Sequence, residues 1–258
     1  MAVVVGSSRG FVWMLVALGF PLCRPLNAAT PVPEHTDPAF IKQYVYQHNK
    51  FRSLVSPSAS NMLYMTWDPA LAKLANAWTK NCKFENNPYV AHPYKPHPTF
   101  PAVGENIWLG SSYGIQSPVV AWHEEAQYYS YSGSNCSDMC GHYTQVVWAD
   151  SYKVGCAARQ CSNIEGYPDS KNWAIVVCNY GPAGNTIRKS PYRQGTACSE
   201  CPDDQCVENM CRNDDRDKVK NYPNWQPAIG YGCFSARLYE PLYIIVCLEA
   251  IVDIKFWN

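Results

Sequence analysis

The sequence predicts an α/β fold in which helices cover a small β-sheet, followed by a separate cysteine-rich segment. Three helix starts share one pattern, an Asp or Ser directly followed by Pro, and two later stretches have the length and apolar content of strands. The 258 residues also contain 13 cysteines, which is typical of proteins that are cross-linked in an oxidising compartment.

Three helices are expected after a short lead-in at 30–36. They open at 37–38, 68–69 and 117–118, where Asp or Ser caps the helix and Pro occupies its first turn. Each start is followed by a stripe of side chains at helical spacing. The stripes are Ile41, Val45, His48 and Arg52 in the first helix, Leu71, Leu74, Ala75, Trp78 and Cys82 in the second, and Val119, Trp122, Ala126 and Tyr129 in the third.

A loop with five prolines occupies 83–104, between the second and third helices. Because prolines cannot donate backbone hydrogen bonds, we expect disulfides to hold this loop in place. Strands are expected at 152–159 and 173–180, and the second of these ends just before Gly181-Pro182. The order of helices and strands therefore predicts helices packed over a small sheet.

The N-terminal residues 1–29 are typical of a secretory signal peptide. Arg9 supplies a positive charge, residues 11–22 are apolar, and the small residues Ala28 and Ala29 follow. The apolar run is too short to cross a bilayer as a helix. Removal of this segment would take one cysteine with it and leave twelve, an even number.

The C-terminal residues 216–258 are expected to form a tail. Its last part is apolar but is interrupted by three charged residues, which disfavours a membrane-spanning helix. Cleavage near Ser235 and Ala236 for a glycolipid anchor is an open alternative. The fate of Cys233 and Cys247 depends on which alternative holds.

The balance of charge gives no reason to expect nucleic acid as a partner. The chain has 21 basic and 21 acidic residues, so its formal net charge is zero. Aromatic residues are abundant, with 9 Trp and 18 Tyr. Most of them are expected in the core, and those left exposed would suit a surface that recognises another protein.

Four cysteines fall within 14 residues, at Cys198, Cys201, Cys206 and Cys211. Few large apolar residues accompany them, so we expect a small cysteine-rich hinge at 191–215 whose stability comes from disulfides. A zinc knuckle is the alternative. The four residues between the second pair and the absence of a nearby histidine favour disulfides.

Several separated motifs resemble those of the CAP superfamily, the cysteine-rich secretory, antigen 5 and pathogenesis-related proteins. Three are signature stretches, and two are similar to the first and third helices of that family. The resemblance covers 36–190, and the surroundings of His142 and the hinge are most similar to the mammalian glioma pathogenesis-related and related-like proteins. The motifs are GENIW at 104–108, GHYTQVVW at 141–148, VCNYGPAGN at 177–185, His48-Asn49 with Arg52, and WHEE at 122–125.

The resemblance implies a CAP domain at 36–190 with a three-layer α-β-α sandwich. It also implies a short helix near 142–148, where the alternation of side chains alone would predict a strand. The absence of six further cysteines after the hinge means that no ion-channel regulatory domain is expected. The disulfides implied by the resemblance are Cys82–Cys161, Cys136–Cys140, Cys156–Cys178, Cys198–Cys206 and Cys201–Cys211.

Many CAP proteins place two histidines and two glutamates in a central cleft. The matching positions here are Glu105, Glu125 and His142, while Asn86 stands where the resemblance implies the second histidine. Imidazole and carboxylate groups suit zinc, or general acid–base chemistry. Because an amide oxygen is a poor zinc ligand beside imidazole, we expect weak zinc binding at Glu105, Glu125 and His142, and no required cofactor.

Other interpretations of the polar residues near this cleft remain open. His92 and His97 lie in the proline-rich loop and could replace the missing ligand, but surface histidines are the simpler expectation. His48 is expected to be a hydrogen-bonded packing residue. Glu105 and Gln145 could satisfy each other in a polar interior instead of serving a ligand.

The expected function is that of a secreted or cell-surface interaction protein that is not an enzyme. For some relatives the resemblance implies a role in sperm binding to the egg coat, with an extracellular protein as partner. Two alternatives are a binder of sterols or fatty acids, and a metal-dependent hydrolase using the cleft residues. An N-glycosylation sequon begins at Asn135 and is expected at the surface.

Overall fold

The structure is a computed structural model that describes residues 32–91, 93–111, 113–114 and 117–229. The signal peptide, His92, and the C-terminal positions Cys233, Ser235, Ala236 and Cys247 lie outside the described residues. Within them, no helix is both long and apolar enough to cross a membrane.

Two of the three helix starts are capped as the sequence predicts. Helix α1 (Pro38–Ser53) begins at Asp37, whose side chain accepts a hydrogen bond from a backbone N–H of the first turn. Helix α2 (Pro69–Thr79) begins at Asp68, which accepts two such bonds. Helix α3 (Pro118–Glu124) also starts where expected, but the Ser117 hydroxyl donates to Gln47 on α1 instead of capping its own helix.

The region after α3 contains a short 3-10 helix, η1 (Glu125–Tyr128), a two-stranded ribbon of β3 (Tyr129–Ser130) and β4 (Asn135–Cys136), and helix α4 (Gly141–Val146). Helix α4 confirms the resemblance and shows that a strand predicted from alternation would be wrong. Its residues from Tyr143 to Val146 are all buried, so no alternation of buried and exposed side chains exists there.

The main sheet has four strands in the order β1-β5-β6-β2. The predicted strands correspond to β5 (Lys153–Gln160) and β6 (Ala174–Gly181), each within one residue of expectation. The outer strands β1 (Thr66–Trp67) and β2 (Gly104–Gly110) were not predicted. Strand β1 is parallel to β5, and the other neighbours are antiparallel, so the sheet is mixed.

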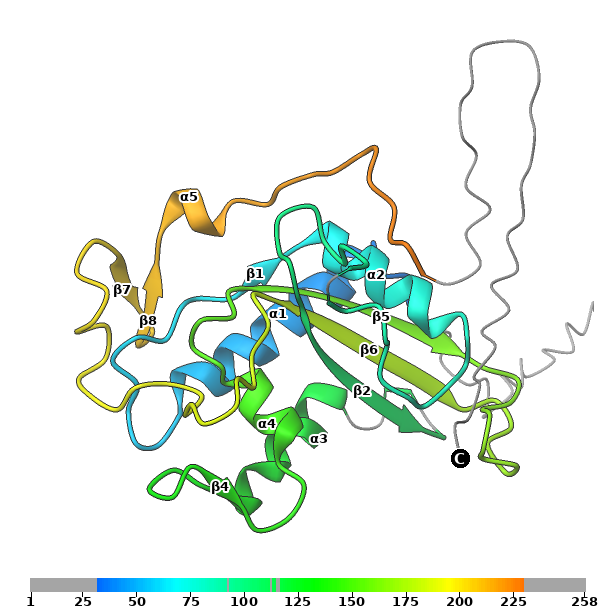
Figure 1. Cartoon of the computed structure of the whole chain (residues 1–258), viewed down its shortest axis with the longest axis horizontal. Coiled ribbons are helices and arrows are strands. Elements are labelled where there is room, and N and C mark those ends of the chain that lie inside the picture. Colours follow the sequence, from blue (N-terminus) through cyan, green and yellow to red (C-terminus); the bar gives the residue numbers. More distant parts are fainter. Residues whose placement is uncertain (1–31, 92, 112, 115–116, 230–258) are drawn as a thin grey trace, which may run out of the picture.

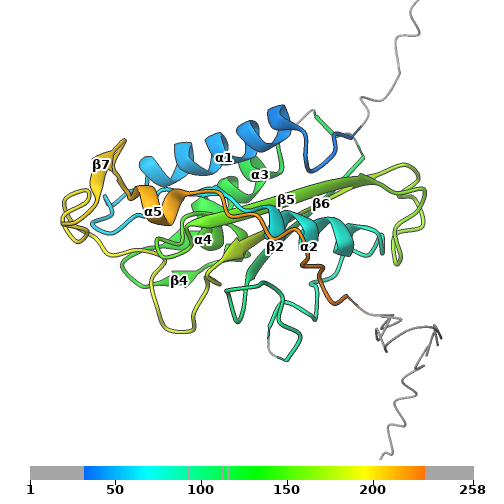
Figure 2. The same ribbon diagram turned by 90° about the horizontal axis from the view of Figure 1, so that it is seen from above.

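The two faces of this sheet are covered by different helices, which confirms the three-layer α-β-α sandwich. Side chains alternate along the central strands. Val154, Cys156 and Tyr180 pack in a core with α1, α3 and α4, while Ile175 and Val177 pack with α2 on the opposite face. Figure 2 shows α1 and α3 on one side of the sheet and α2 on the other.

Helix α2 approaches β5 closely because Gly155 has no side chain. A Cβ atom at this position would overlap the backbone of α2 near Ala72 and Asp68. The predicted stripe of α2 is buried through Trp78, but the helix ends at Thr79 and Cys82 lies beyond it. Cys82 instead begins the proline-rich loop and is bonded to Cys161.

The first helix buries a different stripe from the one predicted. His48 and Arg52 are fully buried as expected, but Phe40 and Tyr44 accompany them in the core. Ile41 and Val45 are only half-buried, on the side of α1 that faces the C-terminal part of the chain.

Arg52 joins α1 to two other stretches of the domain, at Leu63 and at 146–151, through backbone carbonyl groups. Its side chain is 1% exposed, and no carboxylate among the described residues pairs with it. Burial lowers the pKa of Arg52 to about 9, so the guanidinium still carries its charge at pH 7. The accepting carbonyl oxygens belong to Leu63, Val146, Trp148, Ala149 and Ser151.

Ten cysteines form five disulfides, and the pairs are those that the resemblance implied. Three lie in the sandwich and two in the hinge. The four hinge cysteines are therefore cross-linked and not zinc ligands. The pairs are Cys82–Cys161, Cys136–Cys140, Cys156–Cys178, Cys198–Cys206 and Cys201–Cys211.

The hinge packs into the main core, contrary to the expectation that disulfides alone hold it. It contains a hairpin of β7 (Gln205–Val207) and β8 (Met210–Arg212), followed by a short helix α5 (Asp214–Asp217). Met210 is fully buried in the core formed with α1, and the Cys211 backbone pairs with the segment 62–64. The hairpin is thus an extension of the domain (Figure 1).

The first part of the predicted tail also packs against the sandwich. After α5 the chain runs across α2, as the orange segment of Figure 1 shows. Lys153 is 3% exposed, and its ammonium donates to Thr66 Oγ1 at 2.7 Å and to the carbonyl oxygens of Asp217 and Lys218. Further along, Lys73 of α2 donates to two backbone carbonyls of this segment.

Candidate functional site

The four cleft positions lie on four different elements. Glu105 is on β2, Glu125 is the first residue of η1 after α3, His142 is in the first turn of α4, and Asn86 is in the loop after α2. Whether they form one site depends on the hydrogen bonds that each side chain already makes.

Glu125 and His142 form a close pair. His142 Nδ1 lies 2.6 Å from Glu125 Oε1, so the imidazole donates from Nδ1 to the carboxylate. The other oxygen, Oε2, accepts from the backbone N–H groups of His142 and Tyr143, at 3.0 and 3.3 Å. The residue before α4, Cys140, offers no side-chain cap, so the Glu125 carboxylate takes over that role at the start of the helix.

This arrangement makes Glu125 an orienting residue for His142. With the Nδ1 proton held by the carboxylate, the neutral imidazole keeps Nε2 as its acceptor nitrogen. The ring stacks on the buried Trp122 of α3, with an angle of 22° between the planes and 6.2 Å between the centroids. His142 is therefore fixed in both tautomer and direction.

Glu105 is held by a different set of groups. Its Oε1 accepts from the Asn87 backbone N–H at 2.7 Å, and its Oε2 accepts from Asn179 Nδ2 at 3.3 Å. Burial raises the pKa of Glu105 to about 7. Gln145, which was one alternative partner of Glu105, does not bind it, because the Gln145 amide instead contacts Ser151 and the Gly184 backbone.

Asn86, which stands at the position of the missing histidine, is exposed. Its neighbour Asn87 is buried and supplies the backbone contact to Glu105.

His97 is not the surface histidine that the sequence suggested. It is 3% exposed, its Nε2 donates to Asp68 at 3.2 Å, and its Nδ1 accepts from the Thr99 and Phe100 backbone N–H groups. Both of its nitrogens are therefore used, and it cannot replace the missing ligand. It holds the proline-rich loop against the start of α2, a task expected of disulfides.

The donor atoms of the cleft do not fit a zinc ion in this arrangement. The ligand atoms of Glu105, Glu125 and His142 do not all lie within 4.8 Å of one another. Among the described residues, the atoms that do gather this closely belong to Cys201, Asp204 and Cys211. Two of these are joined by a disulfide, so this group is not a metal site either.

A buried chain of polar groups supports the cleft from behind. Asn106 Nδ2 donates to the His142 carbonyl at 3.0 Å and to the Tyr180 hydroxyl at 3.2 Å. Tyr180 in turn contacts His48 Nε2 at 2.9 Å, and His48 Nδ1 donates to the Tyr44 carbonyl. Desolvation lowers the pKa of His48 to about 4, so this histidine is a neutral packing residue, as predicted.

The residues that satisfy the cleft were not identified from the sequence. Asn179 and Tyr180 belong to the third signature stretch and Asn106 to the first, but no pattern assigned them a partner. Their roles follow from the pairing of β2 with β6, which places Glu105 opposite Asn179 and Asn106 opposite Cys178.

Two further predicted features can be placed. Of the stripe predicted for the third helix, Val119 and Trp122 are buried in the core, and Ala126 and Tyr129 pack against it. Asn135 lies on β4 and is exposed, which agrees with the expected surface position of its sequon.

The family model for the cysteine-rich secretory protein family, CAP, matches residues 45–180. The chain therefore belongs to this family, as its motifs implied. The bovine protein "GLIPR1-like protein 1" is 44% identical over 251 residues, which cover 96% of this chain and 99% of that protein. The mouse "Glioma pathogenesis-related protein 1" is 49% identical over 240 residues, which cover 89% and 87% of the two chains.

A solved structure has the same fold. The structure titled "Crystal structure of NaASP2 with Zn2+" is similar with a TM-score of 0.54 at 27% identity, and the match covers 71% of this chain and 98% of that one. The similarity confirms the CAP fold of the sandwich. Proteins of this family are typically secreted.

Proposed function

We propose that this protein acts outside the cell as a non-catalytic binding protein whose partner is another protein. The proposal rests on the contacts that the residues at the four cleft positions already make. Both oxygens of Glu125 bind the start of α4, Glu105 accepts hydrogen bonds from Asn87 and Asn179, and an exposed asparagine stands at the fourth position. The inherited polar residues thus stabilise the domain instead of converging on a metal or a substrate.

The comparison with the zinc-containing relative sharpens this view. That structure is titled with Zn²⁺. Among the described histidines that could have replaced the missing ligand, His97 and His48 use both ring nitrogens elsewhere, so neither supplies a second imidazole beside His142 Nε2. A single imidazole with two hydrogen-bonded carboxylates supports at most weak zinc binding.

The extracellular location is supported by several features of the chain. Five disulfides are stable only in an oxidising compartment, the N-terminus is typical of a signal peptide, and the sequon at Asn135 is exposed. A glycolipid anchor and a role in sperm–egg binding are narrower forms of the same proposal. Expression in a mammalian secretory line, with phospholipase treatment of the cells, would separate a released protein from an anchored one.

The proposal is tested by assaying the purified mature protein for hydrolysis of peptide and ester substrates, with and without added zinc. We expect no turnover that depends on Glu125. The variant Glu125→Gln serves as the matched control, because it keeps the size of the side chain and removes its charge. Turnover that a chelator inhibits and that Glu125→Gln lacks would show that the protein is a hydrolase.

A further inference from the structure

A groove of about 710 Å³ lies between α1 and residues 208–219, which include the end of the hinge and the start of the tail. We name it the α1–hinge groove. Its volume falls within the range of about 300–1,000 Å³ that is typical of ligand sites. Its apolar lining is formed by Ile41, Val45, Tyr64, Trp67 and Val219.

Apolar side chains also stand exposed at both rims of the groove. Tyr46 on α1 is 63% exposed, and Val219 on the opposite side is 57% exposed. Ile41 and Val45 explain why the stripe predicted for α1 was only partly buried: these two residues pack at the edge of the core and also line the groove. An apolar channel with exposed aromatic and aliphatic rims is typical of a surface that binds another protein.

The charges around the groove are unbalanced. Lys42 and Lys50 on α1 are exposed, and neither forms an ion pair with a described residue. On the hinge side the groove carries Arg212, Glu208 and Asp217. Asp217 is 8% exposed and already contacts Arg212 and Arg216, so its charge is offset inside the protein.

One further cation lies next to the groove. The Lys153 ammonium is bonded to Thr66, which lines the groove, whereas Arg216 is already paired with Asp204 and Asp217 and adds no unpaired charge. The carboxylate of Glu208 remains the single acidic group of the groove without an ion pair among the described residues. The groove is therefore complementary to a negatively charged ligand.

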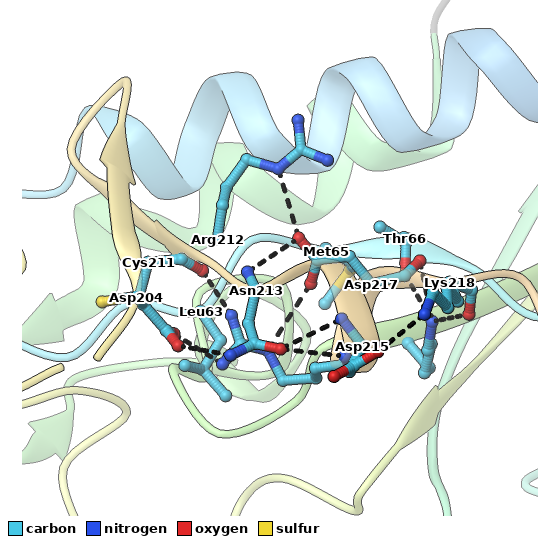
Figure 3. A network of polar contacts seen from close by, with 12 residues as sticks. Leu63, Met65, Thr66, Asp204, Cys211, Arg212, Asn213, Asp215, Asp217 and Lys218 are labelled. Carbon is cyan, nitrogen blue, oxygen red and sulfur yellow. Dashed lines mark hydrogen bonds and ion pairs between the residues drawn. The ribbon is translucent and has the colours of Figure 1, made fainter.

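Arg212 is positioned to contact such a ligand. Its Nε donates to Asp217 at 3.2 Å, and its guanidinium lies 4.2 Å above the ring of Tyr64. Figure 3 shows the two terminal nitrogens of Arg212 pointing away from the polar network and toward α1. A guanidinium held in this way can bind a carboxylate with both of its terminal nitrogens.

One backbone position beside the groove is already occupied. The side-chain amide of Asn49 binds both the N–H and the carbonyl of Met65, at 2.9 and 2.8 Å, just before β1. These two backbone groups are therefore not available to a ligand in the groove.

We propose that the α1–hinge groove binds an extended peptide segment of the partner protein that carries one or two carboxylates between aliphatic side chains. The carboxylates would contact Arg212, Lys42 and Lys50, and the aliphatic groups would cover Trp67 and Val45. A sulfated glycan fits less well, because three cations flank a floor that is mainly apolar. This inference rests on the proposed binding function and names the surface that performs it.

The experiment selects peptides from a phage library of random dodecapeptides on the immobilised mature protein. We expect the selected peptides to be enriched in Asp and Glu next to Val, Ile or Leu. The affinity of the best synthetic peptide is then measured for three variants. The double variant Lys42→Gln with Lys50→Gln, and separately Arg212→Gln, should each weaken binding by about tenfold or more.

A second double variant, Lys80→Gln with Lys171→Gln, is the matched control. It removes the same charge from two exposed lysines outside the groove, and it should change affinity by less than about twofold. Arg212→Gln can disturb the hinge through its contact with Asp217, whereas neither lysine of α1 forms an ion pair with a described residue. Equal binding by both double variants, selected peptides without acidic residues, or no selected peptide would each overturn the assignment. None of these outcomes bears on whether the cleft is catalytic.

Discussion

At the scale of single residues, the polar interior is organised by a few side chains that bind backbone groups. Arg52 is the clearest case. It belongs to a family motif, yet its side chain binds five carbonyl oxygens in the core. His97 and Glu125 act in a similar way, at the start of α2 and of α4. Position in a family motif therefore did not separate structural from chemical roles.

Arg52→Met should lower the free energy of unfolding by at least about 3 kcal/mol, because several buried carbonyl groups lose their donor. Urea denaturation of the purified variants measures this effect. Arg188→Met, which replaces an exposed arginine, should stay within about 0.5 kcal/mol of the unsubstituted protein. A loss of less than about 1 kcal/mol for Arg52→Met would contradict the role assigned to this residue.

Glu105 should make the stability depend on pH in a defined direction. Its pKa is about 7 in the folded state, above its ordinary value of 4.5, so the folded protein binds the proton more tightly than the unfolded chain does. The Glu105 contribution is therefore fully present below about pH 4.5 and is lost as the pH rises through 7. His48, with a folded pKa of about 4, acts in the opposite sense: its contribution is lost as the pH falls from 6.5 to 4.

The test compares the unfolding free energy of Glu105→Gln with that of the unsubstituted protein from pH 4 to pH 8. The difference should shift in favour of Glu105→Gln by roughly 3 kcal/mol as the pH rises from 4.5 to 7. The part of this difference that does not change with pH reflects the altered hydrogen bonds and is not caused by the titration of Glu105. A difference that does not change with pH would show that Glu105 has its ordinary pKa in the folded protein.

At the scale of elements, the sequence predicted what local chemistry determines. The three helix starts were evident because Asp or Ser before Pro defines a first turn, and β5 and β6 were evident from their length and apolar content. Strand β1 was missed because two residues are too few to show an alternation of polar and apolar side chains. Strand β2 was missed because this alternation is weak in the GENIW stretch. The pairs Glu105–Asn179 and His97–Asp68 depend on contacts far apart in sequence, which no local pattern reports.

The hinge hairpin is the element whose role differs most from expectation. Its composition suggested that disulfides alone stabilise it, yet Met210 reaches the core next to α1. One apolar residue in a polar segment gives no periodic signal. Its burial depends on the docking of β8 against residues 62–64.

Met210→Ala should destabilise the whole domain by about 2–5 kcal/mol, because the substitution leaves a cavity in the main core. Met139→Ala is the matched control, since that methionine is 64% exposed and should change stability by less than about 0.5 kcal/mol. Thermal unfolding followed by circular dichroism measures both. If Met210→Ala loosened only the hinge and left the unfolding midpoint of the sandwich unchanged, the hinge would be an independent unit.

At the scale of the whole molecule, the hinge and the segment 218–229 pack against the sandwich. Helix α1 and residues 208–219 form the α1–hinge groove, where unpaired lysines and apolar side chains meet. The resemblance identified the fold and the disulfides, whereas the groove could not be foreseen, because it is formed only when the hinge docks on α1.

The most direct test of a non-catalytic protein with a disabled cleft is zinc binding by isothermal titration calorimetry. Asn86→His restores the imidazole that the family pattern implies, and Asn81→His, an exposed asparagine nearby in the chain, is the matched control. We expect the unsubstituted protein and Asn81→His to bind zinc weakly, and Asn86→His to bind at least about tenfold more tightly. Tight zinc binding by the unsubstituted protein, equal to that of Asn86→His, would contradict the proposal that this cleft no longer serves a metal.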